Sequence, residues 1–487
     1  MTQTTAHTQR FERAKATLDA VGQSHVLSFF DELNQAEQDQ LLSQIEGIDW
    51  QEVSRLIESH VKQKPQAEVP DHIDPAPYYP HQPSSELKSK YDQAREKGET
   101  LLREGKVAAF TVAGGQGTRL GWEGPKGTFP ATPIRRLPLF GCFAEYIQRA
   151  QQHYNTTIPW YVMTSAANDQ QTRQAFKDND YFGLDPNQVM FFQQGMMPAI
   201  DMHSHRALME SKASLALSPD GHGGSLKALY ESGALADMKQ RGIEQISYTQ
   251  VDNPLVRVVD PLFIGLHALD SAAMSSKMLP KRSSEEKLGN FCLVDGRVQI
   301  IEYSDLPDEL AKQRLEDGSL RFTAGSIAIH VISCKFVEHL NTQHKGFGLP
   351  WHRAEKKVAH LDLDTQQTVK PETPNAVKLE TFVFDALPMC DTSIVYETDR
   401  IDEFAPIKNA DTPAGEPPAS DSPESSKQIQ IERAGRWLEQ TGVTVPRNDQ
   451  GAVDATLEIS QRTAIEPDDL QAIELPKTIE RGSERLL

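Results

Sequence analysis

The stretch from Val107 to Gly127 constrains the fold of this chain most, because a buried strand runs directly into a glycine-rich turn. Residues 107–113 are almost continuously apolar, which is typical of a parallel strand covered on both faces. Gly114, Gly115 and Gly117 follow, and glycine lets a backbone turn sharply and expose its N–H groups to a ligand. The pattern therefore predicts an α/β fold whose strand ends in an anion-binding loop.

Two cations in the same stretch indicate that the anion is a phosphate. Arg119 offers a planar fork of donors that suits phosphate oxygens, and Lys126 offers a movable point charge. A dinucleotide fingerprint would need Gly or Ala where Leu120 stands, and a P-loop would need Gly-Lys-Ser/Thr where the chain has Pro125-Lys126-Gly127-Thr128. A tight turn whose glycines serve packing alone stays open as the alternative.

Further strands follow in the rhythm of an α/β domain. Apolar runs at residues 160–164 and 189–192 predict the second and third strands, and residues 245–251 predict a strand that ends at Asp252. An aspartate at the carboxyl end of such a strand can bind a Mg²⁺ ion that bridges a triphosphate. A capping or turn aspartate is the alternative.

The pattern along the chain predicts three consecutive regions. Residues 1–100 form an N-terminal helical lobe, with amphipathic helices over residues 8–64, a capping pair of Asn34 and Glu37, a proline-rich connector at 64–85 and a helix over 87–102. Residues 101–385 form the catalytic α/β domain. Residues 386–487 form a small C-terminal domain, with a flexible Pro/Ser-rich segment at 410–426, a helix at 429–442 and a short strand at 455–459.

Composition narrows the class of partner. The 50 Lys and Arg residues against 69 Asp and Glu give a net charge of −19, which opposes binding to nucleic acid or to an anionic membrane. The four cysteines show no C-x-x-C spacing, which favours buried free thiols in a reducing cytosol over a zinc site or disulfides. The N-terminus lacks a signal sequence, and no apolar run is long enough to span a membrane. We expect a cytoplasmic protein that is a monomer or a weak homo-oligomer.

Seven further motifs accompany the glycine-rich stretch in the order of a known family. They are Met163-Thr164-Ser165, Tyr181 to Ile200, Ser218 to Gly224, Thr249 to Gly265, Ile301 to Leu306, Asn375 to Leu387 and Asp402 to Asp411. Over roughly Leu27 to Asp411 the chain resembles the sugar nucleotidyltransferases that make UDP-sugars from UTP and a sugar 1-phosphate, most closely the eukaryotic-type UDP-N-acetylglucosamine pyrophosphorylases. The resemblance implies a doubly wound, Rossmann-like nucleotidyltransferase core with a mixed, mainly parallel sheet, which binds ligands at strand C-termini.

The resemblance also implies roles for individual residues. For the nucleotide it implies Val112, Ala113, Gly114, Gly115, Lys126, Gln194, Gly221, Asp252 and Lys378. For the sugar it implies His222, Gly289, Glu302, Tyr303, Ser326 and Lys408. Gln194 would read the uracil edge, because an amide both donates and accepts hydrogen bonds. Without the family, Glu302 would be read as lying on an exposed strand face, and the two lysines of the later motifs as solvated.

The implied reaction needs no covalent intermediate. A sugar 1-phosphate oxygen attacks the α-phosphorus of UTP in line and pyrophosphate leaves, so positioning and charge stabilisation carry catalysis. We expect the N–H groups of Gly114 and Gly115, with Arg119, to hold the triphosphate. Lys126 would act on the α-phosphate and Lys408 on the sugar phosphate. Asp252 would bind the Mg²⁺ (or Mn²⁺) cofactor.

Two departures from the family bear on the sugar. The family motif GNGG is GHGG here, with His222 in place of Asn, as in the UDP-glucose pyrophosphorylase relatives. In a GNIANH segment, Ser326 and Ile329 replace the two asparagines. We expect a uridylyltransferase that makes UDP-N-acetylglucosamine, with UDP-glucose or a broad range of UDP-sugars as the alternative. A regulatory protein that binds UTP or a UDP-sugar is the non-enzyme alternative.

Overall fold

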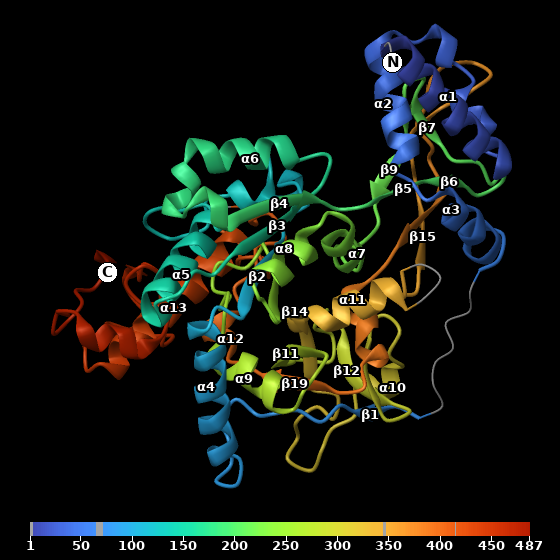
Figure 1. The fold of residues 1–487 in the computed structure, drawn as a ribbon. Coiled ribbons are helices and arrows are strands. Elements are labelled where there is room, and N and C mark those ends of the chain that lie inside the picture. Colours follow the sequence, from blue (N-terminus) through green and yellow to red (C-terminus); the bar gives the residue numbers. More distant parts are fainter. Residues whose placement is uncertain (1–2, 65–71, 344–346, 414) are drawn as a thin grey trace. The chain divides into compact units, whose positions relative to one another are not determined.

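The structure of the protein is a computed structural model that describes residues 3–64, 72–343, 347–413 and 415–487. It divides into two compact units that alternate along the chain (Figure 1). The first comprises Met1–Glu68, Gln194–Lys227 and Gly348–Val383, and the second comprises Val69–Gln193, Ala228–Phe347 and Phe384–Leu487. The sequence suggested three consecutive regions, whereas each unit is assembled from three separated segments.

The first unit combines the N-terminal helices with short strands. Its helices are α1 (Gln3–Ala20), α2 (Gln35–Glu46) and α3 (Trp50–Leu56), with short turns η1 (Ser24–Leu27), η2 (Phe30–Glu32) and η3 (Ile57–Val61). Its strands are β5 (Met196–Pro198), β6 (Ile200–Asp201), β7 (Met209–Ser211), β8 (Ser214–Leu215), β9 (Leu217–Pro219), β15 (His352–Lys356), β16 (His360–Leu361), β17 (Thr368–Val369) and β18 (Ala376–Glu380). The expected capping pair is confirmed: Glu37 N donates to Asn34 Oδ1 (3.1 Å), and Asn34 N donates to Glu37 Oε2 (2.9 Å).

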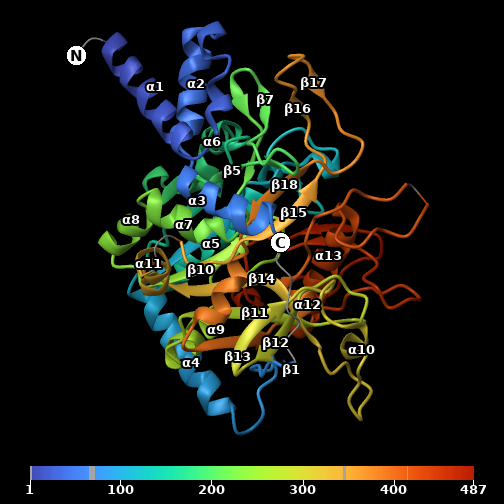
Figure 2. The same cartoon turned by 90° about the vertical axis from the view of Figure 1, so that its right-hand side faces the viewer.

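One apolar core explains why distant segments share the first unit. Helices α1 and α2 lie side by side (Figures 1 and 2) and pack through Leu18, Leu41 and Leu42. The same cluster contains Ile200 from the second segment and Val377 from the third. The N-terminal helices therefore bury their apolar faces against strands that lie more than a hundred residues further along the sequence.

The second unit is built on a ten-stranded mixed sheet. The strands are β1 (Asp74–Pro75), β2 (Val107–Val112), β3 (Trp160–Thr164), β4 (Val189–Gln193), β10 (Gln245–Gln250), β11 (Met274–Pro280), β12 (Asn290–Val294), β13 (Arg297–Ile301), β14 (Ala324–Ser333) and β19 (Ser393–Glu397). Strands β10, β2, β3 and β4 are parallel neighbours, whereas β14 pairs antiparallel with both β10 and β11. The expected mixed sheet is confirmed, and its parallel part carries the glycine-rich loop.

Helices and a C-terminal layer complete this unit. Its α-helices are α4 (Lys88–Arg103), α5 (Leu139–Tyr154), α6 (Asp169–Asp178), α8 (Ala234–Gln240), α9 (Pro261–Leu269), α10 (Asp308–Ala311), α11 (Cys334–Thr342), α12 (Arg400–Glu403) and α13 (Pro423–Gln440), while α7 (Gly224–Glu231) contains residues of both units. The unit also contains the short turns η4 (Thr118–Leu120), η5 (Lys126–Thr128), η6 (Asp180–Gly183), η7 (Pro186–Gln188) and η9 (Pro467–Ala472), while η8 (Val383–Met389) contains residues of both units. Strand β20 (Thr456–Glu458) pairs with β21 (Glu484–Leu486).

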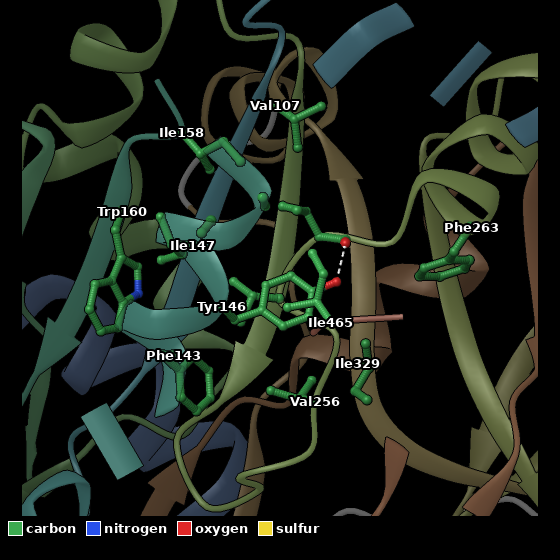
Figure 3. Packing of buried hydrophobic residues seen from close by; sticks show 14 of the residues in the cluster. Val107, Phe143, Tyr146, Ile147, Ile158, Trp160, Val256, Phe263, Ile329 and Ile465 are labelled. Carbon is green, nitrogen blue, oxygen red and sulfur yellow. Dashed lines mark hydrogen bonds between the residues drawn. The ribbon is translucent and has the colours of Figure 1, made fainter. Parts of the chain in front are cut away.

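The main core of the second unit lies on one face of its sheet. Figure 3 shows Trp160 from β3 beside Phe143 and Ile147 from α5, with Val107 from β2 in the same cluster. Tyr146 is buried in the same core, where its hydroxyl donates to the Val259 carbonyl (2.7 Å). A buried tyrosine thus keeps a partner for its polar end.

Helices α4 and α9 cross so closely that glycine is required on both. A Cβ atom on Gly98 would lie 1.8 Å from the Pro261 carbonyl oxygen, and one on Gly265 would lie 1.6 Å from the Ala94 carbonyl oxygen. Only a residue without a side chain fits such an approach.

The structure confirms some of the other predictions and corrects others. The predicted strands and the helices at 87–102 and 429–442 are confirmed, and the latter begins earlier, at Pro423. The expected flexible segment 410–426 therefore loses its last residues to α13, because Ser422 caps that helix through Ser425 N (3.2 Å). Within the connector 64–85, residues 65–71 lie outside the described residues, and Asp74 and Pro75 join the sheet as β1. The four cysteines are buried and free.

Membrane insertion finds no support from the helices. Among the described residues, none forms a helix with both the length and the apolar character that crossing a bilayer demands.

Candidate active site

The glycine-rich loop after β2 is held through its carbonyl groups. Asn168 Nδ2 donates to the carbonyls of Ala113 (2.9 Å) and Gly115 (3.2 Å), and Ser165 Oγ donates to that of Gly114 (2.8 Å). In a trans peptide the next N–H points away from the carbonyl. The N–H groups of Gly114 and Gly115 therefore point away from Ser165 and Asn168, as an anion-binding loop requires.

The loop then folds back on itself. Gly117 N donates to the Gly124 carbonyl (2.9 Å), and Lys126 N donates to the Gly115 carbonyl (3.1 Å). Because the loop folds back, both predicted cations, Arg119 and Lys126, line one cavity of about 480 Å³. The cavity is lined by Gly115, Gln116, Thr118, Arg119, Leu120, Lys126, Asp252 and Lys408.

Asp252 follows β10 and faces the lysine of the loop. Its Oδ2 lies 3.6 Å from Lys126 Nζ, and the two side chains are only 12% and 17% exposed. Its backbone carbonyl accepts from Ile407 N (2.8 Å), which places Lys408 at the same cavity. Lys408 Nζ lies 3.8 Å from Asp421 Oδ2. Three cations and one carboxylate in a cavity of this size can bind a polyphosphate and neutralise its charge.

The carboxylates near this cavity limit how a metal could bind. Across residues 3–64, 72–343, 347–413 and 415–487, no group of three or more His, Cys, Asp or Glu side chains could hold a metal ion. Asp252 alone fits an ion that takes its other ligands from substrate phosphates and water, as Mg²⁺ does. Burial raises the pKa of Asp421, and the nearby Asp252 carboxylate raises it further.

Three of the predicted sugar residues meet where β12, β13 and β14 adjoin. Ser326 N donates to the Gly289 carbonyl (2.8 Å). A Cβ atom on Gly289 would lie 2.7 Å from Ile300 Cγ2 and 3.2 Å from Glu302 Oε1, so the Glu302 carboxylate lies against the glycine. Tyr303 is 46% exposed. A carboxylate and a hydroxyl beside a bare backbone suit the hydroxyl groups of a sugar.

A second set of predicted residues gathers in the first unit. Gln194 Nε2 donates to the Gly221 carbonyl (2.7 Å). Gly221 has a φ of +85°, and a Cβ there would lie 2.3 Å from the Thr381 carbonyl oxygen. The turn therefore needs glycine for both its conformation and its packing. Lys378 lies in the neighbouring strand β18, opposite Ala354 of β15.

His222 lies half-buried in an aromatic stack. Its ring lies 5.3 Å from the ring of Phe382, which in turn lies 4.5 Å from the ring of His352. Its Nδ1 accepts from Val383 N (3.1 Å), so the proton of the neutral ring is on Nε2. Burial lowers the pKa of His222 to about 4. His222 is therefore a neutral side chain at physiological pH, able to donate but carrying no charge.

Several residues of this site carry little or no distinguishing signal in the sequence. Asn168 braces the glycine-rich loop but lies in the turn before α6, in a stretch with no recognisable motif, and Asp421 lies in the segment expected to be flexible. Asn253 stands beside Asp252, and its adjacency to a strand-end aspartate was the one available signal. Its role depends on contacts with residues about 150 positions away.

Comparison with known proteins gives consistent results. Residues 50–412 match the family model described as UTP-glucose-1-phosphate uridylyltransferase. The chain is 35% identical to the UDP-N-acetylhexosamine pyrophosphorylase-like protein 1 of Xenopus tropicalis, over 88% of this chain and 85% of that one. It is 32% identical to the UDP-N-acetylglucosamine pyrophosphorylase of Saccharomyces cerevisiae, over 87% and 90%.

A solved structure is similar over almost the whole chain. It is the uridine diphosphate N-acetylglucosamine pyrophosphorylase from Trypanosoma brucei in complex with an inhibitor. The TM-score is 0.79 at 25% identity, with 98% of each chain covered.

Proposed function

Since the chain belongs to the UTP-glucose-1-phosphate uridylyltransferase family, we propose that it transfers the uridylyl group of UTP to a sugar 1-phosphate and releases pyrophosphate. The observation that carries the proposal is the cavity of about 480 Å³ on which Arg119, Lys126, Lys408 and Asp252 meet. Its position at the carboxyl ends of the parallel strands β2 and β10 is where doubly wound nucleotide-binding folds hold their ligands.

The proposed roles follow from charge and position. The loop N–H groups and Arg119 bind the triphosphate of UTP, and Lys126 stabilises the charge that develops on the α-phosphate. Lys408 holds the incoming sugar phosphate for in-line attack. The family resemblance assigns Gln194, Gly221 and Lys378 to the nucleotide, and Gly289, Glu302 and Ser326 to the hydroxyl groups of the sugar. Catalysis of this kind needs no protein nucleophile.

Magnesium is the proposed cofactor, with Mn²⁺ as a substitute. Asp252 would hold it together with substrate phosphates, and the ion would supply positive charge to the triphosphate. Asp252 lies 3.6 Å from Lys126, so the lysine and a cation would share one carboxylate. Metal dependence is tested by chelation with EDTA, which should abolish turnover until Mg²⁺ is restored.

N-acetylglucosamine 1-phosphate is the proposed sugar substrate. The names of the relatives at 32–35% identity support it, since they are N-acetylglucosamine or N-acetylhexosamine enzymes. His222 and Ser326 favour the second candidate, glucose 1-phosphate, because they replace the asparagines expected in acetamido-sugar enzymes. We further propose that the protein works in the cytoplasm as a monomer or weak homo-oligomer.

A substrate panel tests this proposal. Purified protein is incubated with UTP, Mg²⁺ and either N-acetylglucosamine, glucose, N-acetylgalactosamine or galactose 1-phosphate, and pyrophosphate release is measured. Highest kcat/KM with N-acetylglucosamine 1-phosphate is expected, whereas a preference for glucose 1-phosphate would support the second candidate. Binding of UTP without pyrophosphate release from any sugar phosphate would contradict the proposed enzymatic activity. It would support the alternative of a regulatory protein that binds the nucleotide.

A further inference from the structure

Asn253 ties the loop after β10 to a distant segment of the chain. The residue is buried, and its Nδ2 donates to the Glu403 carbonyl (2.6 Å) while its Oδ1 accepts from Ala405 N (3.0 Å). Oδ1 also accepts from Leu255 N (3.2 Å). One neutral amide thus satisfies backbone groups on both sides of the contact, which a side chain of another type would leave unpaired.

The segment held by Asn253 leads directly to the proposed sugar-phosphate lysine. Two residues beyond Ala405, Ile407 N donates to the Asp252 carbonyl (2.8 Å), and Lys408 follows. Neighbouring residues 252 and 253 therefore fix this segment at two points. The main chain of Lys408 is set relative to Asp252 by these bonds.

A buried ion cluster anchors the start of the same segment. Both oxygens of Glu403 accept from Lys277 Nζ (2.6 and 2.7 Å), and Lys277 also contacts Asp260 (2.6 Å). Lys277 and Glu403 are fully buried. Glu403 accepts further from Thr398 Oγ1 (2.6 Å). Burying charges is costly unless every group is paired, so this cluster has a narrowly defined geometry.

We propose that Asn253 is a positioning residue that holds Lys408 in place to bind the phosphate of the sugar substrate. The inference rests on the proposed function and deepens it, because it assigns the placement of one substrate to one buried amide. Asn253 acts through the backbone of residues 403–407 and contacts no substrate itself. The competing explanation is a purely structural role, in which the amide stabilises the fold and both substrates are affected alike.

A double-mutant cycle separates these explanations. Asn253→Ala, Lys408→Ala and the double variant are compared with the unchanged protein, varying each substrate in turn. Misplacement of Lys408 should raise the KM for the sugar 1-phosphate about tenfold to hundredfold, with the KM for UTP changed less than about twofold. If Asn253 acts through Lys408, Lys408→Ala should cost much less in the Asn253→Ala background than alone.

Gln188→Ala is the matched control. Gln188 is another buried amide of the second unit, and its Nε2 donates to Gln151 Oε1 (3.0 Å) and to the Ile158 carbonyl (3.3 Å). Its loss should lower stability and leave both KM values unchanged. If Asn253→Ala does not fold, Asn253→Ser replaces it in the cycle, because a hydroxyl retains part of the hydrogen bonding.

The outcomes distinguish failure of the inference from failure of the proposed function. Additive effects of the two substitutions, or an equal rise in both KM values, would overturn the role of Asn253 while leaving the enzyme intact. Absence of turnover in the unchanged protein with every sugar phosphate would instead overturn the proposed function, on which the inference rests.

Discussion

The nucleotide loop and the segment 403–408 line the same cavity but are held by different forces. Neutral side chains, Asn168 and Ser165, hold the loop by donating to three consecutive carbonyls. The first residue of the segment 403–408, Glu403, instead forms a buried ion pair with Lys277. Both arrangements fix a backbone, but only the second depends on full charges kept out of water.

The two halves of the site should therefore respond differently when the contacts that hold them are removed. A lost neutral hydrogen bond costs about 1 kcal/mol and leaves the rest of the loop in place. A broken buried ion pair leaves an uncompensated charge, which costs about 3–5 kcal/mol. We therefore expect damage beneath Lys408 to spread into global stability, whereas damage beneath the loop should stay local.

Removing Lys277 should have the largest effect. Lys277→Met leaves the Glu403 and Asp260 carboxylates without their shared cation. We expect the free energy of unfolding to fall by about 3–5 kcal/mol, measured by urea denaturation. Lys277→Met combined with Glu403→Gln removes one of the two stranded charges and should be more stable than Lys277→Met alone. Equal stability of the two variants would argue against the ion cluster as the anchor.

Removing Lys126 should spare the fold and damage the chemistry. Lys126→Ala is expected to lower kcat by about 10²- to 10³-fold, because a positioned cation is lost where charge develops. Arg119→Ala should act more on the KM for UTP, since its assigned role is to hold the triphosphate. Steady-state kinetics of pyrophosphate release check both. A Lys126→Ala enzyme with unchanged kcat would remove the lysine from the mechanism.

Acid should destabilise the sheet of the second unit through a neutral buried histidine. His267 lies 2.7 Å from Ser275 Oγ and 3.0 Å from Gln245 Oε1, and burial lowers its pKa to about 3. In the unfolded chain the pKa is about 6.5, so the unfolded state takes up a proton first as the pH falls. This stability is present above pH 6.5 and is lost toward pH 3.

The pH effect can be measured directly. Because of His267, the free energy of unfolding should fall by about 1.4 kcal/mol for each pH unit between these limits, or by about 2 kcal/mol between pH 6.5 and 5. His267→Gln should make the unfolding free energy depend less steeply on pH over that range. An unchanged slope would show that His267 is already charged in the folded protein.

The smallest effect should come from replacing Asn168, the neutral side chain that holds the glycine-rich loop. Asn168→Ala removes the donors to the Ala113 and Gly115 carbonyls. We expect the KM for UTP to rise about tenfold, in line with the loss of about one to two net hydrogen bonds, with little change for the sugar 1-phosphate. The reverse pattern is expected for Asn253→Ala. If both variants raised the same KM, the two halves of the site would not be separable.

Local patterns of the sequence were sufficient to predict the strand and loop that line the cavity. The apolar run before Gly114 predicts β2, and Arg119 and Lys126 stand out because they follow a glycine-rich turn in a chain with a net charge of −19. Asp252 was predicted because it closes an apolar strand. These residues are encoded within short windows, where periodicity and glycine chemistry act.

Long-range contacts explain what could not be predicted. Asn253 and Lys277 reach Glu403 only when segments over a hundred residues apart come together. Asp421 was assigned to a flexible stretch on composition, yet its carbonyl accepts from Lys408 N (2.6 Å). Composition reports how much apolar surface a segment can bury, and it carries no information on such contacts.

Pyrophosphate release from UTP and N-acetylglucosamine 1-phosphate, with UDP-sugar quantified in the same reaction, tests whether the protein is a uridylyltransferase. We predict that the two products form in a one-to-one ratio, that EDTA stops both, and that Lys126→Ala loses both about 10²- to 10³-fold. Tight UTP binding with no pyrophosphate formed, from this sugar phosphate or any other, would contradict the account.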